Sequence, residues 1–340
     1  MIVRRFLQYG ATASRREFLR GLASSASALA LGGCASVGAT GARFDASPLS
    51  AGPTLLVTTT RKPVNGGRAK PWFGPERASR MTVARAKLVP PDDSRFSLAA
   101  AGLADWRLDG VEPVPGEVSD LLAQSSGGSD VLIYVHGFKQ TFETAALDAA
   151  HLSDGIRFKG QTMVFSWPSK AGLLDYAYDR DSAMWSRDAF ERVLQSIVAA
   201  PSGGRVHIVA HSMGTMLTLE SLRQLHARNG DTVADRIGAV VFAAPDIDMD
   251  VFSSTINRIG PLARKITVIA ATNDRALALS GRIAGGVSRV GAAEKAVIEQ
   301  LGVRVIDASD AGWGIINHDL FLSNAEVRQV IRRSIDTAAA

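Results

Sequence analysis

Cysteine is almost absent from this sequence, in which Cys34 is the only one among 340 residues. A domain with one cysteine forms no internal disulfide and no cysteine-based metal cluster. Long uninterrupted apolar runs are also missing, which argues against a membrane-spanning helix. Histidine is scarce as well, with six residues, so few side chains are available to act as a base near neutral pH.

Most of the chain also lacks an excess of charge of either sign. The net charge is +5, but residues 1–33 contain five arginines and one glutamate, which leaves about +1 on residues 34–340. A nearly neutral body lacks the basic surface that nucleic-acid binding needs. The composition, 46% hydrophobic and 21% charged, is that of a globular protein large enough to bury a sizeable core.

The N-terminal segment differs from the rest. The pair Arg15-Arg16 precedes a short, uncharged, weakly apolar stretch that resembles a twin-arginine export signal, and Leu31-Gly32-Gly33-Cys34 resembles a bacterial lipobox. These resemblances imply a signal peptide over residues 1–33, a lipid on Cys34, and membrane anchoring in the periplasm or cell envelope. Small polar residues over 34–52 predict a flexible tether. The alternative is a basic amphipathic helix with an incidental cysteine.

Apolar runs alternate with helix-like segments along the remaining chain. Strands are expected at 55–60, 81–89, 131–135, 162–166, 206–210, 237–243, 266–270 and 303–306, and helices at 142–156, 182–199, 214–228 and 324–338. Residues 61–79 are expected to form a loop, and residues 90–127 show no clear division. Strands that are apolar throughout, with helices between them, predict an α/β fold with a doubly wound, mostly parallel sheet of about eight strands.

One pentapeptide stands at a predicted strand-to-helix junction. Ala210-His211-Ser212-Met213-Gly214 has the spacing of a G-x-S-x-G nucleophile elbow, with Ala210 in place of the first glycine. Such a turn exposes the serine hydroxyl and directs a helix N-terminus, which favours negative charge, towards the site. Ser212 is therefore the predicted nucleophile. The alternative is a serine in an ordinary strand–helix turn.

A second motif, His136-Gly137-Phe138, ends an earlier predicted strand. The loop at this position and the residue after the nucleophile supply the N–H groups of the oxyanion hole in such an arrangement. We therefore expect the backbone N–H groups of Phe138 and Met213 to form that hole. The alternative is a simple break between strand and loop.

A serine hydroxyl is a poor nucleophile without a base, and histidine is the usual one. Five histidines are set aside because they lie inside predicted elements, precede the oxyanion loop or adjoin the nucleophile: His136, His151, His207, His211 and His226. His318, after the last strand, is left as the predicted base. The acid that orients it is expected to follow a strand between Ser212 and His318. Asp274 is favoured, and Asp246 is the alternative acid.

Together with Phe165-Ser166-Trp167-Pro168 and Ala243-Ala244-Pro245-Asp246, these motifs resemble an uncharacterised bacterial branch of the α/β hydrolases that is esterase- or lipase-like. The resemblance covers residues 53–335 and implies the α/β-hydrolase fold in one domain, 53–340, with a Ser–Asp–His triad. We therefore expect a serine esterase that acts on a small ester or acyl substrate through an acyl-enzyme, without a metal or organic cofactor. An acyltransferase, thioesterase or peptidase with the same triad stays open, as does a non-catalytic envelope lipoprotein.

The wall of the substrate site is the last expectation. Only residues 244–265 separate two of the predicted strands, which leaves no room for a large cap domain between them. The segment 167–185 carries Tyr176 and Tyr178. It either lines the substrate pocket or only packs over the sheet, and both interpretations stay open.

Overall fold

The computed structural model describes residues 53–64, 69–90, 106–123, 129–200, 204–283, 285–310 and 320–339. All of these belong to one unit of the chain, Gly38–Ala340. The predicted signal peptide, Cys34, the tether and His318 lie outside the described residues.

The described strands form one nine-stranded sheet in the order β3-β2-β1-β5-β4-β6-β7-β8-β9. They are β1 Thr54–Pro63, β2 Phe73–Val89, β3 Arg107–Pro113, β4 Val131–Val135, β5 Gln161–Ser166, β6 Val206–His211, β7 Ile237–Ala243, β8 Ile266–Ala270 and β9 Arg304–Asp307. β2 pairs antiparallel with β1 and β3, whereas the pairs from β1 to β9 are parallel. The parallel strands therefore all end at one edge of the sheet, which we call the carboxyl edge; the opposite one is the amino edge.

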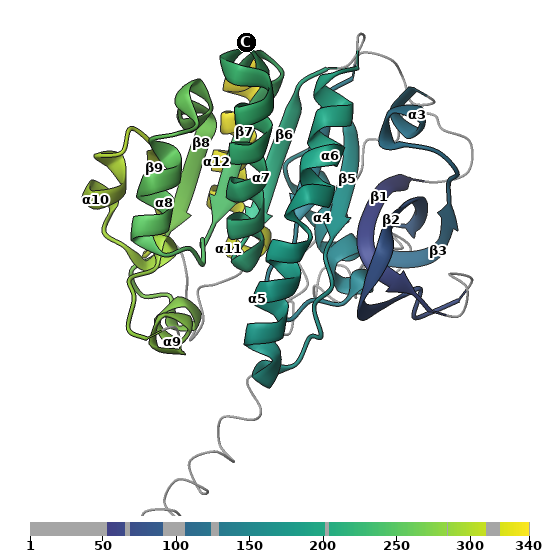
Figure 1. The fold of residues 1–340 in the computed structure, drawn as a ribbon, viewed down its shortest axis with the longest axis horizontal. Helices are drawn as coiled ribbons and strands as arrows, with labels where there is room; N and C mark the ends of the chain where they lie inside the picture. The colour runs from purple at the N-terminus through teal and green to yellow at the C-terminus, as the bar shows by residue number, and fades with distance from the viewer. Residues whose placement is uncertain are drawn as a thin grey trace, which may run out of the picture. The chain divides into compact units, whose positions relative to one another are not determined.

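Helices cover both faces of this sheet (Figure 1). They are α3 Val118–Ala123, α4 Phe142–Gly155, α5 Tyr176–Trp185, α6 Arg187–Val198, α7 Met213–Asn229, α8 Met249–Ile256, α9 Arg275–Ile283, α10 Lys295–Glu299, α11 Leu320–Ser323 and α12 Ala325–Ala339. Helices α5 to α8 lie on one face, and α4, α11 and α12 lie on the other. None of the described helices is both long and apolar enough to cross a membrane.

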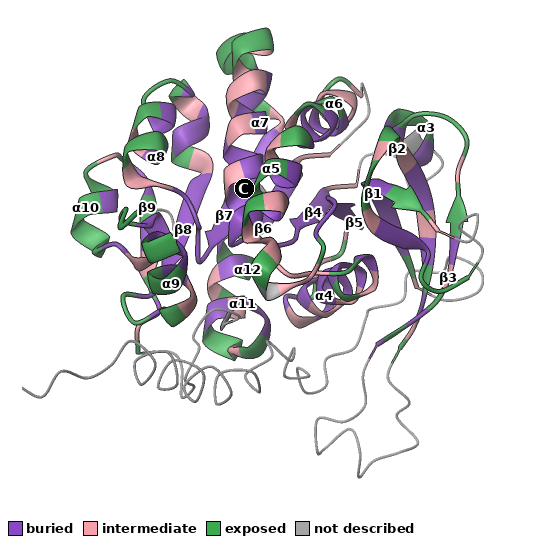
Figure 2. Cartoon of the chain, turned by 60° about the horizontal axis from the view of Figure 1, so that its bottom comes forward, coloured by how far each residue is buried: buried purple, intermediate pink, exposed green. Residues whose placement is uncertain are grey.

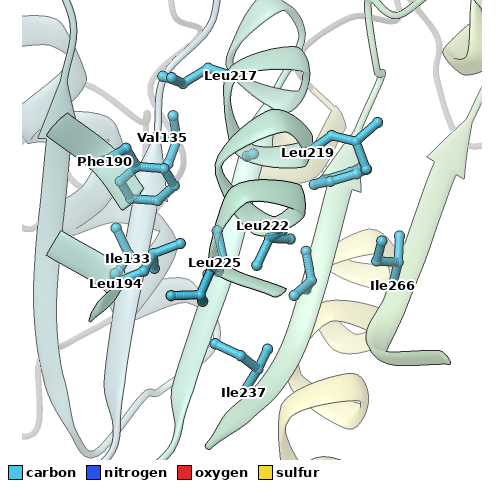
Figure 3. Close-up of a cluster of buried hydrophobic side chains, with 14 of the residues drawn as sticks. Ile133, Val135, Phe190, Leu194, Leu217, Leu219, Leu222, Leu225, Ile237 and Ile266 are labelled. Carbon is cyan, nitrogen blue, oxygen red and sulfur yellow. The ribbon is translucent and has the colours of Figure 1, made fainter. Parts of the chain in front are cut away.

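The two-sided core follows from the alternation of side chains along each strand. In β4, Ile133 and Val135 join one buried cluster with α6 and α7, whereas Leu132 and Tyr134 join the cluster beneath α4 and α12. Figure 3 shows Ile133 and Val135 beside Phe190 of α6. Because both faces are covered, strands β4, β6, β7 and β8 are buried at every position, as Figure 2 shows. Each large apolar side chain that is fully buried in these two clusters stabilises the fold by about 1.5–3 kcal/mol.

The sequence prediction of a doubly wound, mostly parallel α/β sheet is confirmed, with nine strands rather than about eight. Strands 131–135, 237–243 and 266–270 are found at the predicted bounds. Two predictions were wrong. Residues 61–63 and 73–79, predicted as parts of a loop, are strand, because β1 continues to Pro63 and β2 begins at Phe73. The first half of β2 is polar and largely exposed, so it shows no apolar alternation.

The predicted helix 182–199 is two helices, α5 and α6, which meet at Ser186. The buried Ser186 hydroxyl donates to the Ser182 carbonyl at 2.8 Å and lies 2.9 Å from the Thr60 hydroxyl of β1. A serine that bonds to the preceding turn and to a neighbouring strand bends a helix. Apolar spacing continues across this junction and therefore does not reveal it.

Candidate active site

Ser212 lies at the junction of β6 and α7, in a backbone conformation that side chains rarely adopt. Its φ is 49° and its ψ is −120°, and the residue is almost completely buried. The turn is fixed on both sides: the Ser212 N–H donates to the carbonyl of Ala243 at 2.9 Å, and the Ser212 carbonyl accepts the N–H of Asp246 at 3.3 Å. Such strain costs about 1–3 kcal/mol and is typical of functional sites.

Close packing explains the small residue that follows the elbow. A Cβ atom on Gly214 would lie 2.3 Å from the carbonyl oxygen of His136, so no larger residue fits without a shift of backbone. Ala210, which replaces the first glycine of the motif, is buried within β6 between Val135 and Phe242 of its neighbours. A methyl group is accommodated there without strain.

The loop after β4 lies against the elbow. A Cβ atom on Gly137 would be 2.9 Å from Cβ of Ser212 and 2.8 Å from Nδ1 of His211. The structure thus brings the predicted oxyanion loop directly to the predicted nucleophile. Phe138 is half-buried, with its ring edge-on to Tyr176 at 5.5 Å. Met213 is the first residue of α7, where backbone N–H groups have no partner within the helix.

Backbone strain is concentrated around this elbow. Four of the five non-glycine residues with positive φ in the described part of the chain follow the carboxyl ends of adjacent strands: Lys139 after β4, Ala171 after β5, Ser212 after β6 and Ala244 after β7. Left-handed conformations of such residues are uncommon. Their clustering at one edge of the sheet marks that edge as the candidate functional site, since strain persists only where the surroundings enforce it.

Asp246 and Asp274, the two candidate acids, are both buried but differ in their partners. Asp246 accepts the Tyr176 hydroxyl at 2.8 Å and the Ser280 hydroxyl at 2.8 Å, and it forms an ion pair with Arg289 at 3.1 Å. Burial is the main cause that raises the pKa of Tyr176 to about 12, and the adjacent Asp246 adds to it. The Asp246 carboxylate therefore ties three segments of the chain together.

Asp274 stands four residues after β8 and directly precedes α9. One oxygen, Oδ1, accepts the Leu277 N–H at 3.0 Å, and the Asp274 N–H donates to the Ala271 carbonyl at 3.0 Å. These bonds fix the carboxyl group at the start of the helix. Asp274 follows the strand two places along the sheet from β6, so Ser212 and Asp274 both follow strands that end at the carboxyl edge.

The predicted base, His318, lies outside the described residues. Three other histidines have structural partners: His207 pairs with Asp130 at 3.2 Å, His226 pairs with Asp231 at 2.8 Å, and His136 accepts the Trp167 N–H at 3.1 Å. His136 is also stacked on the Trp167 ring at 4.6 Å. Burial, and then the charge of Arg61, hold the pKa of His136 well below its usual value, so this imidazole is neutral.

The sequence analysis did not identify two charged side chains buried near the carboxyl edge. Arg61 is 1% exposed at the end of β1, and Asp179 of α5 is fully buried. Arg61 follows the run Thr58-Thr59-Thr60 and precedes Lys62-Pro63, a pattern that suggests a solvated loop. The signal that could have found Arg61 is its place in the strand: it continues the predicted strand 55–60 at a position where a buried strand usually has an apolar residue.

The segment between β5 and α6 contacts the loops around Ser212 through two side chains. Tyr176 reaches Phe138 and Asp246, and Asp179 accepts the N–H of Lys139 in the loop after β4. The 167–185 segment therefore packs against the candidate site as well as over the sheet.

One cavity of the structure lies away from the carboxyl edge. It has a volume of about 520 Å³ and is lined by residues that precede β4 and β5 and by α12, which places it at the amino edge. The described residues hold no group of three or more histidine, cysteine or acidic side chains suited to a metal ion.

Comparison with known proteins identifies a family. Residues 116–334 match the family described as "Alpha/beta hydrolase of unknown function (DUF900)". A stretch of 61 residues is 36% identical to the uncharacterized protein alr1448 of Nostoc sp. and covers 18% of this chain and 16% of that protein. The chain thus matches only a small part of this curated relative.

The solved structures to which the chain is similar include a cutinase-like protein and an esterase. A cutinase-like protein from Cryptococcus sp. is 14% identical, with 63% of this chain and 97% of that chain covered and a TM-score of 0.37. A hyperthermophilic esterase from the archaeon Pyrobaculum calidifontis is 11% identical, with 85% and 86% covered and a TM-score of 0.38. At such low scores the likeness carries no argument about activity, and the fold is assigned from the strand order and the family match.

Proposed function

Since the chain belongs to a family of α/β hydrolases of unknown function, DUF900, we propose that it is a serine hydrolase of carboxylic esters. The observation that carries the proposal is the strained turn at Ser212, against which the Gly137 backbone is packed. A serine held in this way presents its hydroxyl beside backbone N–H groups, as acyl transfer requires. The family membership supports hydrolysis in general, and the serine mechanism is our inference.

In the proposed reaction the Ser212 hydroxyl attacks the ester carbonyl while His318 accepts its proton. The oxyanion of the tetrahedral intermediate accepts hydrogen bonds from the N–H groups of Phe138 and Met213. The intermediate collapses to an acyl-enzyme, and the leaving alkoxide takes the proton from His318. Water then attacks the acyl group, His318 accepts its proton and returns it to Ser212 Oγ, and the carboxylic acid is released.

Two features of the described site support these roles. Helix α7 begins at Met213, directly after Ser212, so its N-terminus, where negative charge is favoured, adjoins the proposed nucleophile. Asp274 follows β8, which ends at the same edge of the sheet as β6, and its carboxyl group accepts an N–H at the start of α9. We therefore assign Asp274 to orient His318 and to stabilise its charged form.

The test compares two buried serines of the same region. Ser212→Ala is expected to lower turnover of short p-nitrophenyl esters by several orders of magnitude, on the scale of about 10⁶-fold seen when a triad serine is lost. It should also abolish covalent labelling by a fluorophosphonate. Ser221→Ala is the matched control: this α7 hydroxyl donates to the Arg187 and Leu217 carbonyls, and its loss should leave kcat within about twofold.

Unchanged turnover in Ser212→Ala would rule out the mechanism. The same assay separates related chemistries when alcohols or thiols are added as competing acceptors. Ester hydrolysis predicts that the carboxylic acid stays the main product. A main product of transferred ester or thioester would instead assign the triad to an acyltransferase, and a wild-type protein that neither turns over esters nor is labelled would favour a binding role for the fold.

A further inference from the structure

Arg61 is an unusual core residue, because its guanidinium is buried and its described side-chain hydrogen bonds all go to uncharged oxygen atoms. Nε donates to the Ser166 hydroxyl at 2.9 Å; Nη1 donates to the Ser169 carbonyl at 3.0 Å and the Gly74 carbonyl at 3.4 Å; Nη2 donates to the Gln140 carbonyl at 2.7 Å. A rigid fork of donors thus joins the end of β1 to the segments that follow β4 and β5 and to the start of β2.

Burial of such a charge is costly, and a well-packed apolar side chain would stabilise a fold as well or better. Desolvation is the main cause that lowers the pKa of Arg61, to about 10, so the group is still charged at neutral pH. Stability alone therefore does not explain why an arginine occupies this position. The segment to which Arg61 is bound suggests another reason.

The carbonyl that Nη2 binds belongs to the oxyanion loop. Gln140 is two residues after Phe138, and Lys139 between them has a φ of 63°. The Gln140 N–H donates to the Ser169 hydroxyl at 3.3 Å, and the Lys139 N–H donates to the Asp179 carboxylate. The strained end of the loop is thus fixed by three hydrogen bonds to buried polar groups.

Asp179 completes this network. Its carboxylate accepts the Ser169 hydroxyl at 2.5 Å and the Lys170 N–H at 2.8 Å. Burial is the main cause that raises the pKa of Asp179, and the charge of Arg61 acts against that rise. The two opposite charges are therefore joined through Ser169, which contacts both, and through the loop that they hold.

The other end of the loop touches the nucleophile. Gly137 lies so close to Ser212 that the two Cβ positions would be 2.9 Å apart. Four consecutive residues, 137–140, therefore connect the Ser212 contact to the Arg61 hydrogen bond. A loop held at both ends cannot move its Phe138 N–H away from the position of the oxyanion.

We propose that Arg61, acting with Ser169 and Asp179, is a positioning residue that holds the 137–140 loop so that the Phe138 N–H faces the developing oxyanion. This inference rests on the proposed function. It predicts that Arg61 contributes to the rate of acyl transfer and not to ground-state binding, because the hydrogen bond from Phe138 gains most of its strength in the transition state.

The experiment compares Arg61→Lys with Arg236→Lys. Arg236 is the control at the amino edge, where the described partners of its guanidinium are the carbonyls of Ala200, Ile197 and Gly204. Rates on p-nitrophenyl esters are divided by the number of active sites titrated with a fluorophosphonate. Arg61→Lys should lower kcat per site roughly 10- to 100-fold and leave KM within about twofold. This loss of kcat is somewhat smaller than the loss expected when a whole oxyanion-hole donor is removed. Arg236→Lys should leave both constants within about twofold.

A purely structural role for Arg61 would lower the number of titrated sites and leave kcat per site unchanged, and that result would overturn the proposal. Ser169→Ala removes the hydroxyl that binds Gln140 and Asp179 with a smaller change, and it decides the matter if Arg61→Lys does not fold. A lower kcat per site in Ser169→Ala supports the proposal, and an unchanged value overturns it. If Ser212→Ala keeps full turnover, the proposed function itself fails, which is a different result from an active, Ser212-dependent enzyme that is indifferent to Arg61.

Discussion

The two edges of the sheet differ in how much backbone strain and buried charge they contain. The carboxyl edge holds Ser212 in a strained conformation and buries the charged side chains of Arg61 and Asp179. The amino edge has a cavity of about 520 Å³, and several of the charged residues that line it are exposed, Arg157, Lys159 and Arg332 among them. Strain and buried charge thus lie together at the edge that carries the proposed nucleophile, whereas this cavity lies at the other edge.

Physical cost explains this difference. A left-handed non-glycine residue costs about 1–3 kcal/mol, and a buried charge costs several kcal/mol before its partners offset it. A chain selected for stability alone would avoid both features. Their concentration along the ends of β4 to β7 means that the surrounding core must be stable enough to hold a strained edge. The amino edge carries no comparable concentration among the described residues.

The largest expected effect within this comparison separates the two buried acids of the carboxyl edge, Asp274 and Asp246. Asp274→Asn should lower kcat on p-nitrophenyl esters by about 10⁴-fold, as expected when the residue that orients a catalytic histidine loses its charge. Asp246→Asn should lower kcat far less. It should instead reduce the free energy of unfolding by about 3 kcal/mol, because Arg289 is left buried beside a neutral amide. Ester turnover and urea denaturation of both variants measure the two effects.

The reverse outcome would reassign the acid. If Asp246→Asn abolished turnover without loss of stability and Asp274→Asn kept it, Asp246 would be the partner of the base. Each variant therefore controls for the other, since both remove one buried carboxylate charge from the same edge of the sheet.

The central fold was predictable because its signal is local. Runs such as Val131-Leu132-Ile133-Tyr134-Val135 are apolar throughout only when both faces of a strand are covered. The outer strands were harder to predict. β2 is partly polar and exposed, and its pairing with β1 shifts register between Thr59 and Arg61 and again before Pro63. Cross-strand pairing of this kind depends on the neighbour, which a single sequence does not reveal.

The residues of the candidate site likewise fall into those with a local sequence signal and those without one. Ser212 and Gly137 could be proposed from the sequence because an elbow and a close backbone approach demand particular residues at fixed spacing. Arg61 and Asp179 were missed because their partners lie far along the chain: Arg61 binds Gln140 and Ser169, and its residue type alone suggests solvent. The Arg289 pair with Asp246 was missed for the same reason. Long-range polar networks leave no periodic mark in a sequence.

A smaller expected effect is the pH dependence of stability that two buried histidines contribute, one at each edge of the sheet. Burial lowers the pKa of both His136 and His207, and the hydrogen bond that His207 donates to the Asp130 carboxylate opposes the change at His207. A histidine whose folded pKa lies below the unfolded value of about 6.5 contributes stability that is full above that pH and is lost as the pH falls below it, by up to about 1.4 kcal/mol per unit. The loss should extend to lower pH for His136 than for His207.

Urea denaturation between pH 7 and pH 5 measures this loss as the difference between wild type and the variants His136→Gln and His207→Gln. Single variants are compared because Asp154, whose pKa burial raises to about 6, acts in the opposite sense and stabilises the fold as the pH falls through that value. Equal pH dependence in wild type and His136→Gln would contradict the buried, neutral imidazole.

The smallest expected effect is at the rim of the amino-edge cavity. Arg332 pairs with Asp336 at 3.5 Å, and both side chains are about half exposed or more, at 46% and 66%. An exposed pair one helical turn apart contributes at most about 0.5 kcal/mol. Arg332→Ala should therefore change the free energy of unfolding by no more than this and leave kcat within about twofold, whereas Arg61→Lys lowers kcat at the other edge. A loss of turnover in Arg332→Ala as large as that in Arg61→Lys would break the comparison, because it would place the cavity and not the strained edge at the centre of the chemistry.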